Sequence, residues 1–106
     1  MLRGEVDTFF AMGGNFLSAA PDTDQTAAAL RRTRLTVHVS TKLNRSHFIT
    51  GDQALILPAI GRTEEIVAGG RQQFVTVEDS MGVVRASYGR LRPASSLCMS
   101  EVQIVC

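Results

Sequence analysis

Three apolar runs punctuate the first sixty residues of the chain. Val6–Met12 is mainly apolar and ends at two glycines, Leu35–Ser40 is rich in β-branched residues, and Ala54–Leu57 is closed by Pro58. Runs of this length without strict alternation are typical of strands that are buried on both faces of a parallel sheet. The pattern therefore predicts three buried parallel strands.

The segments between these runs predict the crossovers. Gln25–Arg34 is rich in Ala, Leu and Arg, and Asp22 or Thr23 is suited to cap its start, which predicts a helix between the first two strands. A polar loop follows the second strand, and His47–Gln53 predicts a short helical turn that ends at Gly51. The order of elements predicts an α/β fold with a βαβ-type parallel-sheet core over residues 1–60.

The pattern changes after residue 60. The glycines of Gly61–Arg71 predict a loop, and Gln73–Asp79 with Val83–Ser87 predicts an antiparallel β-hairpin, so residues 61–93 form a loop and hairpin region. Residues 94–106 predict a helix over Leu97–Cys106, entered through a cap at Ala94 to Ser96. Because that helix has no C-terminal cap, we expect it to be truncated and the chain to continue in nature.

Composition narrows the functional classes. A chain of 106 residues with 44% hydrophobic residues and a net charge of +1 predicts one folded domain rather than a disordered or nucleic-acid-binding segment. No apolar run is long enough to span a membrane, and the N-terminus lacks the pattern of a secretory signal. We therefore expect a cytoplasmic protein with no membrane partner, in which Cys98 and Cys106 are reduced thiols.

Polar and glycine residues follow the first two predicted strands directly. Because the carboxyl ends of parallel strands meet at one sheet edge, where ligands bind in open α/β sheets, we expect these residues to lie close together. Glycines permit close backbone approach to a phosphate, and the polar set suits a nucleotide. A plain tight turn and a solvated loop remain the alternatives. The candidate cofactor-binding residues are Gly13, Gly14, Asn15, Ser40, Thr41, Lys42, Asn44, Arg45, Ser46 and His47.

The remaining polar residues predict no catalytic centre. Gly61–Glu65 is interpreted as a surface loop, His38 as a packed or surface histidine, and Glu78 and Asp79 as solvated residues of a hairpin turn. No nucleophile with a base, no paired carboxylates and no metal-binding cysteine motif is recognisable. We therefore expect no catalytic and no metal-ligating residue within the chain.

Several longer motifs resemble one family. GGNF after the first strand, VSTKLNRSH, LILPAIGRTE and FVTVEDSM are similar to segments of molybdopterin oxidoreductases, in the formate dehydrogenase-like alpha (catalytic) subunit branch, and the resemblance extends over Val6–Cys106. It implies that the chain is an internal fragment of a larger molybdoenzyme, from a Rossmann-like domain that helps to bind one of two molybdopterin guanine dinucleotides (bis-MGD). The parent protein would perform two-electron oxidation or reduction at Mo or W.

The resemblance also assigns expectations to residues and partners. Gly13, Gly14 and Asn15 match the family's glycine turn against the dinucleotide, and Ser40–His47 matches the segment that meets its guanosine half. Many relatives have an acidic residue after the second strand, where this chain has Ser40 and Thr41. The expected partners are the remainder of the catalytic subunit and an electron-transfer subunit, with an iron–sulfur cluster elsewhere in the parent.

Taken alone, the chain is expected to retain no cofactor and to be inactive. Its exposed apolar surface and strand edges predict self-association of the isolated fragment. The alternative interpretation is an autonomous small α/β module that binds a nucleotide or another protein without redox chemistry. A structural scaffold that binds no ligand is the third.

Overall fold

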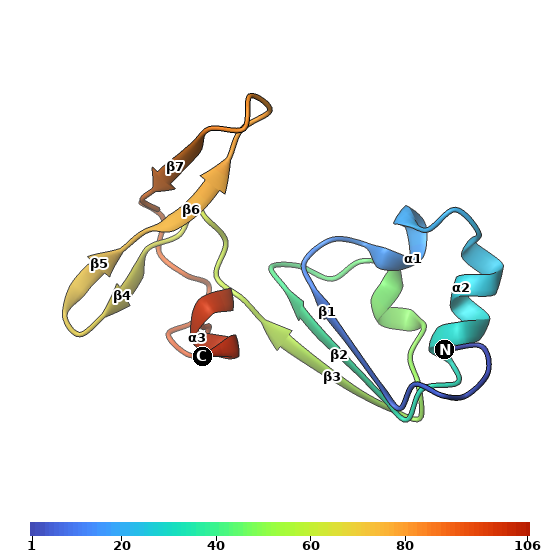
Figure 1. Ribbon diagram of the computed structural model, residues 1–106. Helices are drawn as coiled ribbons and strands as arrows, with labels where there is room; N and C mark the ends of the chain where they lie inside the picture. Colours follow the sequence, from blue (N-terminus) through green and yellow to red (C-terminus); the bar gives the residue numbers. More distant parts are fainter. The chain divides into compact units, whose positions relative to one another are not determined.

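A computed structural model describes all 106 residues as two compact units, an N-terminal unit (Met1–Pro58) and a C-terminal unit (Ala59–Cys106). The N-terminal unit is built on a three-stranded parallel sheet (Figure 1). Its strands are β1 (Thr8–Met12), β2 (Leu35–Ser40) and β3 (Gln53–Pro58), in the order β1-β2-β3. The predicted parallel arrangement of these three segments is confirmed.

Three short helical segments cover one face of this sheet (Figure 1). They are α1 (Phe16–Ala19), α2 (Thr23–Leu30) and the 3-10 helix η1 (Arg45–Phe48). Leu17, Ala27 and Leu30 form the buried cluster, and Phe9 of β1 packs against it from the sheet. Asp22 caps α2 as predicted, since its carboxylate accepts a hydrogen bond from the Gln25 N–H at 2.9 Å.

The expectation that all three strands are buried on both faces is wrong for the outer two. β2 is buried along almost its whole length, whereas β3 is largely exposed. In β1, Phe9 is half-buried on the helical face but Phe10 is 50% exposed on the other. The physical reason is that the helical segments cover only one face of the sheet (Figure 1), and that β1 and β3 each lack a neighbouring strand on one side.

Local side chains set boundaries that the apolar pattern missed. Helix α2 ends at Leu30 rather than Arg34, because the Thr33 hydroxyl donates to the Leu30 carbonyl at 2.8 Å. The helical turn predicted at His47–Gln53 lies instead at η1, where Asn44 caps it. Gly51 does not stop a helix; it lies so close to Thr33 that a Cβ would collide with the Thr33 carbonyl oxygen. Helix α1 was not predicted.

The C-terminal unit contains two antiparallel hairpins and a short helix. The second hairpin was predicted, but the first lies partly in a segment interpreted as loop, where Gly69 and Gly70 form the turn with positive φ. The terminal helix begins later than predicted because Ser100 forms a capping box with Gln103. The elements are β4 (Ile66–Ala68), β5 (Arg71–Gln73), β6 (Val75–Glu78), β7 (Val84–Ser87) and α3 (Glu101–Val105).

Candidate functional site

A pocket of about 270 Å³ lies at the carboxyl edge of the parallel sheet. It is formed where the turn after β1 meets the loop after β2, and those two segments are about thirty residues apart in the sequence. We call it the carboxyl-edge pocket. Seven of the ten candidate residues line it, together with Leu43; the lining is Gly13, Gly14, Asn15, Ser40, Thr41, Lys42, Leu43 and Asn44.

The glycine turn has a conformation that other residues adopt only with strain. Gly13 and Gly14 have φ values of 66° and 65°, and no residue other than glycine has a positive φ in this chain. The Gly13 N–H donates to the Val39 carbonyl of β2 at 2.7 Å, which fixes the turn to the central strand. A Cβ on Gly14 would meet open space, so the backbone at this position is accessible to a ligand.

Three polar side chains join the two segments that form the pocket. The Asn44 amide donates to the Gly14 carbonyl at 2.8 Å, and the Ser46 hydroxyl donates to the Asn15 side-chain oxygen at 2.7 Å. The same Ser46 oxygen accepts the Leu17 N–H at 2.9 Å and is buried. Asn15, Asn44 and Ser46 therefore use hydrogen-bonding groups to hold the two segments together.

Ser40, Thr41 and Lys42 have a different role in the pocket. Their side chains make no hydrogen bond or ion pair within the protein, and Thr41 and Lys42 are exposed. Lys42 is the only charged residue of the lining, and no carboxylate is present. Two hydroxyls and an ammonium group without internal partners suit a phosphoryl group or another anion.

The last three candidate residues do not line the pocket. Arg45 is exposed, whereas Ser46 and His47 are buried beneath the loop. His38, interpreted as a packed or surface histidine, is buried in β2, and its ring centroid lies 4.7 Å from that of His47. Burial, and secondly the nearby His47, lower the pKa of His38 below its ordinary value of 6.5. No sequence pattern indicated this pair, because the two residues meet only through folding.

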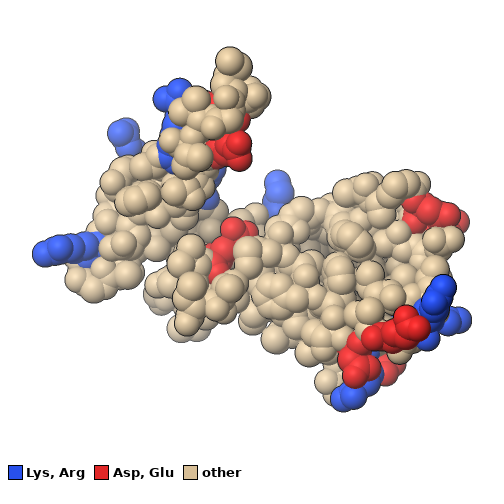
Figure 2. All heavy atoms as spheres, in the orientation of Figure 1, with Lys and Arg blue, Asp and Glu red and all other residues tan.

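The opposite edge of the same sheet has a pocket of different character. It has a volume of about 300 Å³ and is lined by Asp7, Arg34 and Asp52, among others. Arg34 lies 3.6 Å from Asp7, and both side chains are largely exposed. Charged side chains of both signs gather at this end of the N-terminal unit (Figure 2, lower right). The two carboxylates would repel an anion, so the carboxyl-edge pocket is the better anion site.

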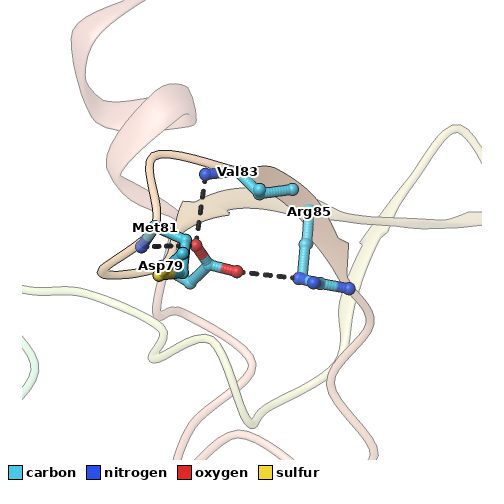
Figure 3. A network of polar contacts seen from close by, with 4 residues as sticks. All are labelled: Asp79, Met81, Val83 and Arg85. Carbon is cyan, nitrogen blue, oxygen red and sulfur yellow. Dashed lines mark hydrogen bonds and ion pairs between the residues drawn. The ribbon is translucent and has the colours of Figure 1, made fainter.

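Acidic residues of the C-terminal unit serve local structure. Glu64 accepts the Gly61 N–H at 2.7 Å within its own turn. Asp79 is not simply solvated as expected: it accepts hydrogen bonds from Arg85 at 3.1 Å and from the Met81 and Val83 N–H groups (Figure 3). These bonds, with Arg85 the largest contributor, lower the pKa of Asp79 below its ordinary value of 3.8.

The chain is similar to one part of much larger proteins. It is 58% identical over all 106 residues to proteins named uncharacterized oxidoreductases from Mycobacterium tuberculosis and Mycobacterium bovis, and it spans 14% of their length. It is 45% identical over 102 residues to protein YdeP of Escherichia coli and spans 13% of that protein. No protein-family model matches the chain, and neither does any solved structure. None of its helices has the length and apolar character needed to cross a membrane.

Proposed function

We propose that this chain is a piece of the cofactor-binding domain of a formate dehydrogenase-like molybdopterin oxidoreductase. In this proposal the three-stranded sheet belongs to a Rossmann-like domain that binds one molybdopterin guanine dinucleotide. The motifs of the sequence and the name oxidoreductase of the mycobacterial relatives support it. The observation that carries it is the carboxyl-edge pocket, where the glycine turn and Ser40–Lys42 meet.

The residues of the pocket fit the polar half of such a cofactor. Lys42 would pair with the diphosphate, and the Ser40 and Thr41 hydroxyls would donate to its oxygens or to the ribose. The backbone of Gly13 and Gly14 would allow the cofactor to approach the sheet closely. When bound, the cofactor supplies two-electron redox chemistry at Mo or W, which the residues of this chain support only by binding.

The carboxyl-edge pocket has no carboxylate, which bears on how the nucleoside half of the cofactor would be bound. The dinucleotide-binding pattern commonly places an acidic residue after the second strand to bind ribose hydroxyls. Ser40 and Thr41 occupy that position here, so the nucleoside half would be held by neutral hydrogen bonds. The remainder of the catalytic subunit would supply the rest of the site, and an electron-transfer subunit would take the electrons.

The test is cofactor retention in the full-length protein that contains this segment. A charge-assisted hydrogen bond is worth about 1.5–3 kcal/mol, so Lys42→Ala should weaken binding by roughly 10- to 100-fold. Metal content by mass spectrometry and guanine nucleotide released on denaturation should both fall. Arg31→Ala is the matched control, because Arg31 is an exposed cation of the same unit outside the pocket. Unchanged metal and nucleotide in Lys42→Ala would contradict the proposal.

A further inference from the structure

Two buried histidines, one in β2 and one at the end of the polar loop that follows it, contact each other. His38 of β2 is 2% exposed and His47 of η1 is 9% exposed, and their rings are tilted by 40° with centroids 4.7 Å apart. The ring of Phe9 lies edge-on to His38 at 6.4 Å. Neither histidine lines the carboxyl-edge pocket, so the proposed cofactor binding does not account for them.

The hydrogen bond of His47 connects this pair to the pocket. His47 Nδ1 accepts the backbone N–H of Asn44 at 3.0 Å and thereby completes the capping box of η1. The same Asn44 accepts the Ser46 N–H at 2.9 Å and donates to the Gly14 carbonyl at 2.8 Å. The same Nδ1 lies 3.1 Å from the Asn44 carbonyl oxygen, so the His47 ring contacts both backbone polar groups of Asn44.

The surroundings of the pair offer no counterion. The Nε2 atoms of both rings are buried without a hydrogen-bond partner. The adjacent β1, β3 and α1 contain no charged side chain, and η1 adds only Arg45, which is exposed and positive. A protonated His38 would therefore be a buried charge without compensation, which is strongly unfavourable.

We propose that His38, through its contact with His47, is a pH-sensitive support that holds the polar loop Ser40–His47 against the glycine turn only while the His38 ring is neutral. His47 links His38 to the loop, because its ring lies 4.7 Å from that of His38 and its Nδ1 contacts the Asn44 backbone. A proton on His38 places a charge beneath the loop and favours separation of the rings. Acidification then releases Asn44 from Gly14 and opens the carboxyl-edge pocket.

The direction of the pH dependence follows from the lowered pKa of His38. Its pKa in the folded protein lies below the ordinary 6.5, so the unfolded or opened state binds the proton more readily. The stability that neutral His38 confers is complete above pH 6.5 and is lost as the pH falls from 6.5 through the lowered pKa. A bound ligand is not required for this behaviour, so the inference stands independently of the proposed function.

The test is an NMR titration, from pH 8 to pH 5, of the full-length protein that contains this segment, with isotope labels confined to these 106 residues. On acidification, the amides of Gly14, Asn44 and Ser46 should shift together with the imidazole signals of His38. Loop amides that stay unchanged while His38 titrates would overturn the proposal.

Two substitutions distinguish a loop response caused by the histidine pair from any other effect of low pH on the protein. His47→Gln keeps a capping-box acceptor that does not titrate, and His38→Phe keeps an aromatic ring in the stack. The double variant should match the wild type at pH 8 and lose the pH response of the loop. In His47→Gln alone, the His38 titration should move up toward 6.5, because the like charge is removed.

The single variant keeps the test decisive if the double variant does not fold. A loop response in His47→Gln at the same pH and amplitude as in the wild type would overturn the role of His47. Arg45→Gln, which removes the exposed charge of the same short helix, serves as the control and should leave the wild-type response intact. A wild-type loop that does not respond to pH would overturn this proposal alone, and a Lys42→Ala protein that keeps its cofactor would overturn only the proposed function.

Discussion

The two units of the chain differ in how much apolar surface they bury. Six of the eight buried hydrophobic residues belong to the N-terminal unit, and only Ala59 and Ile66 belong to the C-terminal unit. The C-terminal unit leaves many large apolar side chains exposed, among them Val67, Phe74, Val84, Leu97 and Val102. The N-terminal unit thus has a core of its own, whereas the C-terminal unit has almost none.

The difference follows from the two kinds of strand connection. Parallel strands need crossovers, and α1 and α2 in the first crossover bring Leu17, Ala27 and Leu30 onto the sheet. Antiparallel strands are joined by tight turns that add no second layer, and isolated two-stranded hairpins are marginal in water. The C-terminal unit relies on backbone hydrogen bonds such as Glu65 N–H to the Leu91 carbonyl at 2.7 Å.

Truncation of the Leu30 side chain should have the largest effect on stability. Its side chain is 0% exposed, so Leu30→Ala should lower the free energy of unfolding of the N-terminal unit by about 2–5 kcal/mol. The matched change in the other unit is Leu97→Ala, where the side chain is 87% exposed and the expected effect is within about 0.5 kcal/mol. Denaturant unfolding measures both, and similar losses of stability in the two variants would contradict the difference in core between the units.

Substitution of one closely packed glycine in each unit should have an intermediate effect on stability. A Cβ on Gly51 would collide with the Thr33 carbonyl, and a Cβ on Gly89 would collide with the backbone of Glu64. Each Gly→Ala variant should destabilise its own unit by about 1–3 kcal/mol through overpacking. Amide hydrogen exchange should show lost protection around Thr33 in one variant and around Glu64 in the other. Loss of protection in the opposite unit would contradict this assignment.

The smallest effect concerns the turn of the β6–β7 hairpin. Because hydrogen bonds lower the pKa of Asp79, its contribution to stability is present above pH 3.8 and is lost as the pH falls through the lowered value. Arg85→Gln should raise the Asp79 pKa toward 3.8, since Arg85 is the largest cause of the shift. A carboxyl NMR titration measures this change, and the N-terminal unit should not respond to the substitution. An unchanged Asp79 titration would contradict the role of Arg85.

Most of the N-terminal elements could be predicted from the chain. Leu35–Ser40 matches β2 in full because β-branched residues favour strands over helices. Asp22 could be identified as a cap because capping depends on residues within one turn. The prediction failed for β4 and α1, which are short segments whose apolar periodicity is too brief to recognise.

The candidate site was predictable to the extent that topology alone places it. Glycines after β1 and hydroxyls after β2 share one pocket because carboxyl ends of adjacent parallel strands share one edge. Which side chains face a ligand could not be predicted in the same way. Ser46 is 31 residues from Asn15, and their hydrogen bond depends on how η1 packs against α1.

By itself, the sequence determined the parallel strands, the capped helix between the first two and the edge where polar residues gather, because these depend on local propensity and on strand direction. Only the tertiary structure decided that Asn44 and Ser46 hold the loop, that Ser40, Thr41 and Lys42 are free of internal partners, and that His38 stacks on His47. Hydrogen-bond partners and burial arise from residues distant in the chain, and these distances exist only after folding.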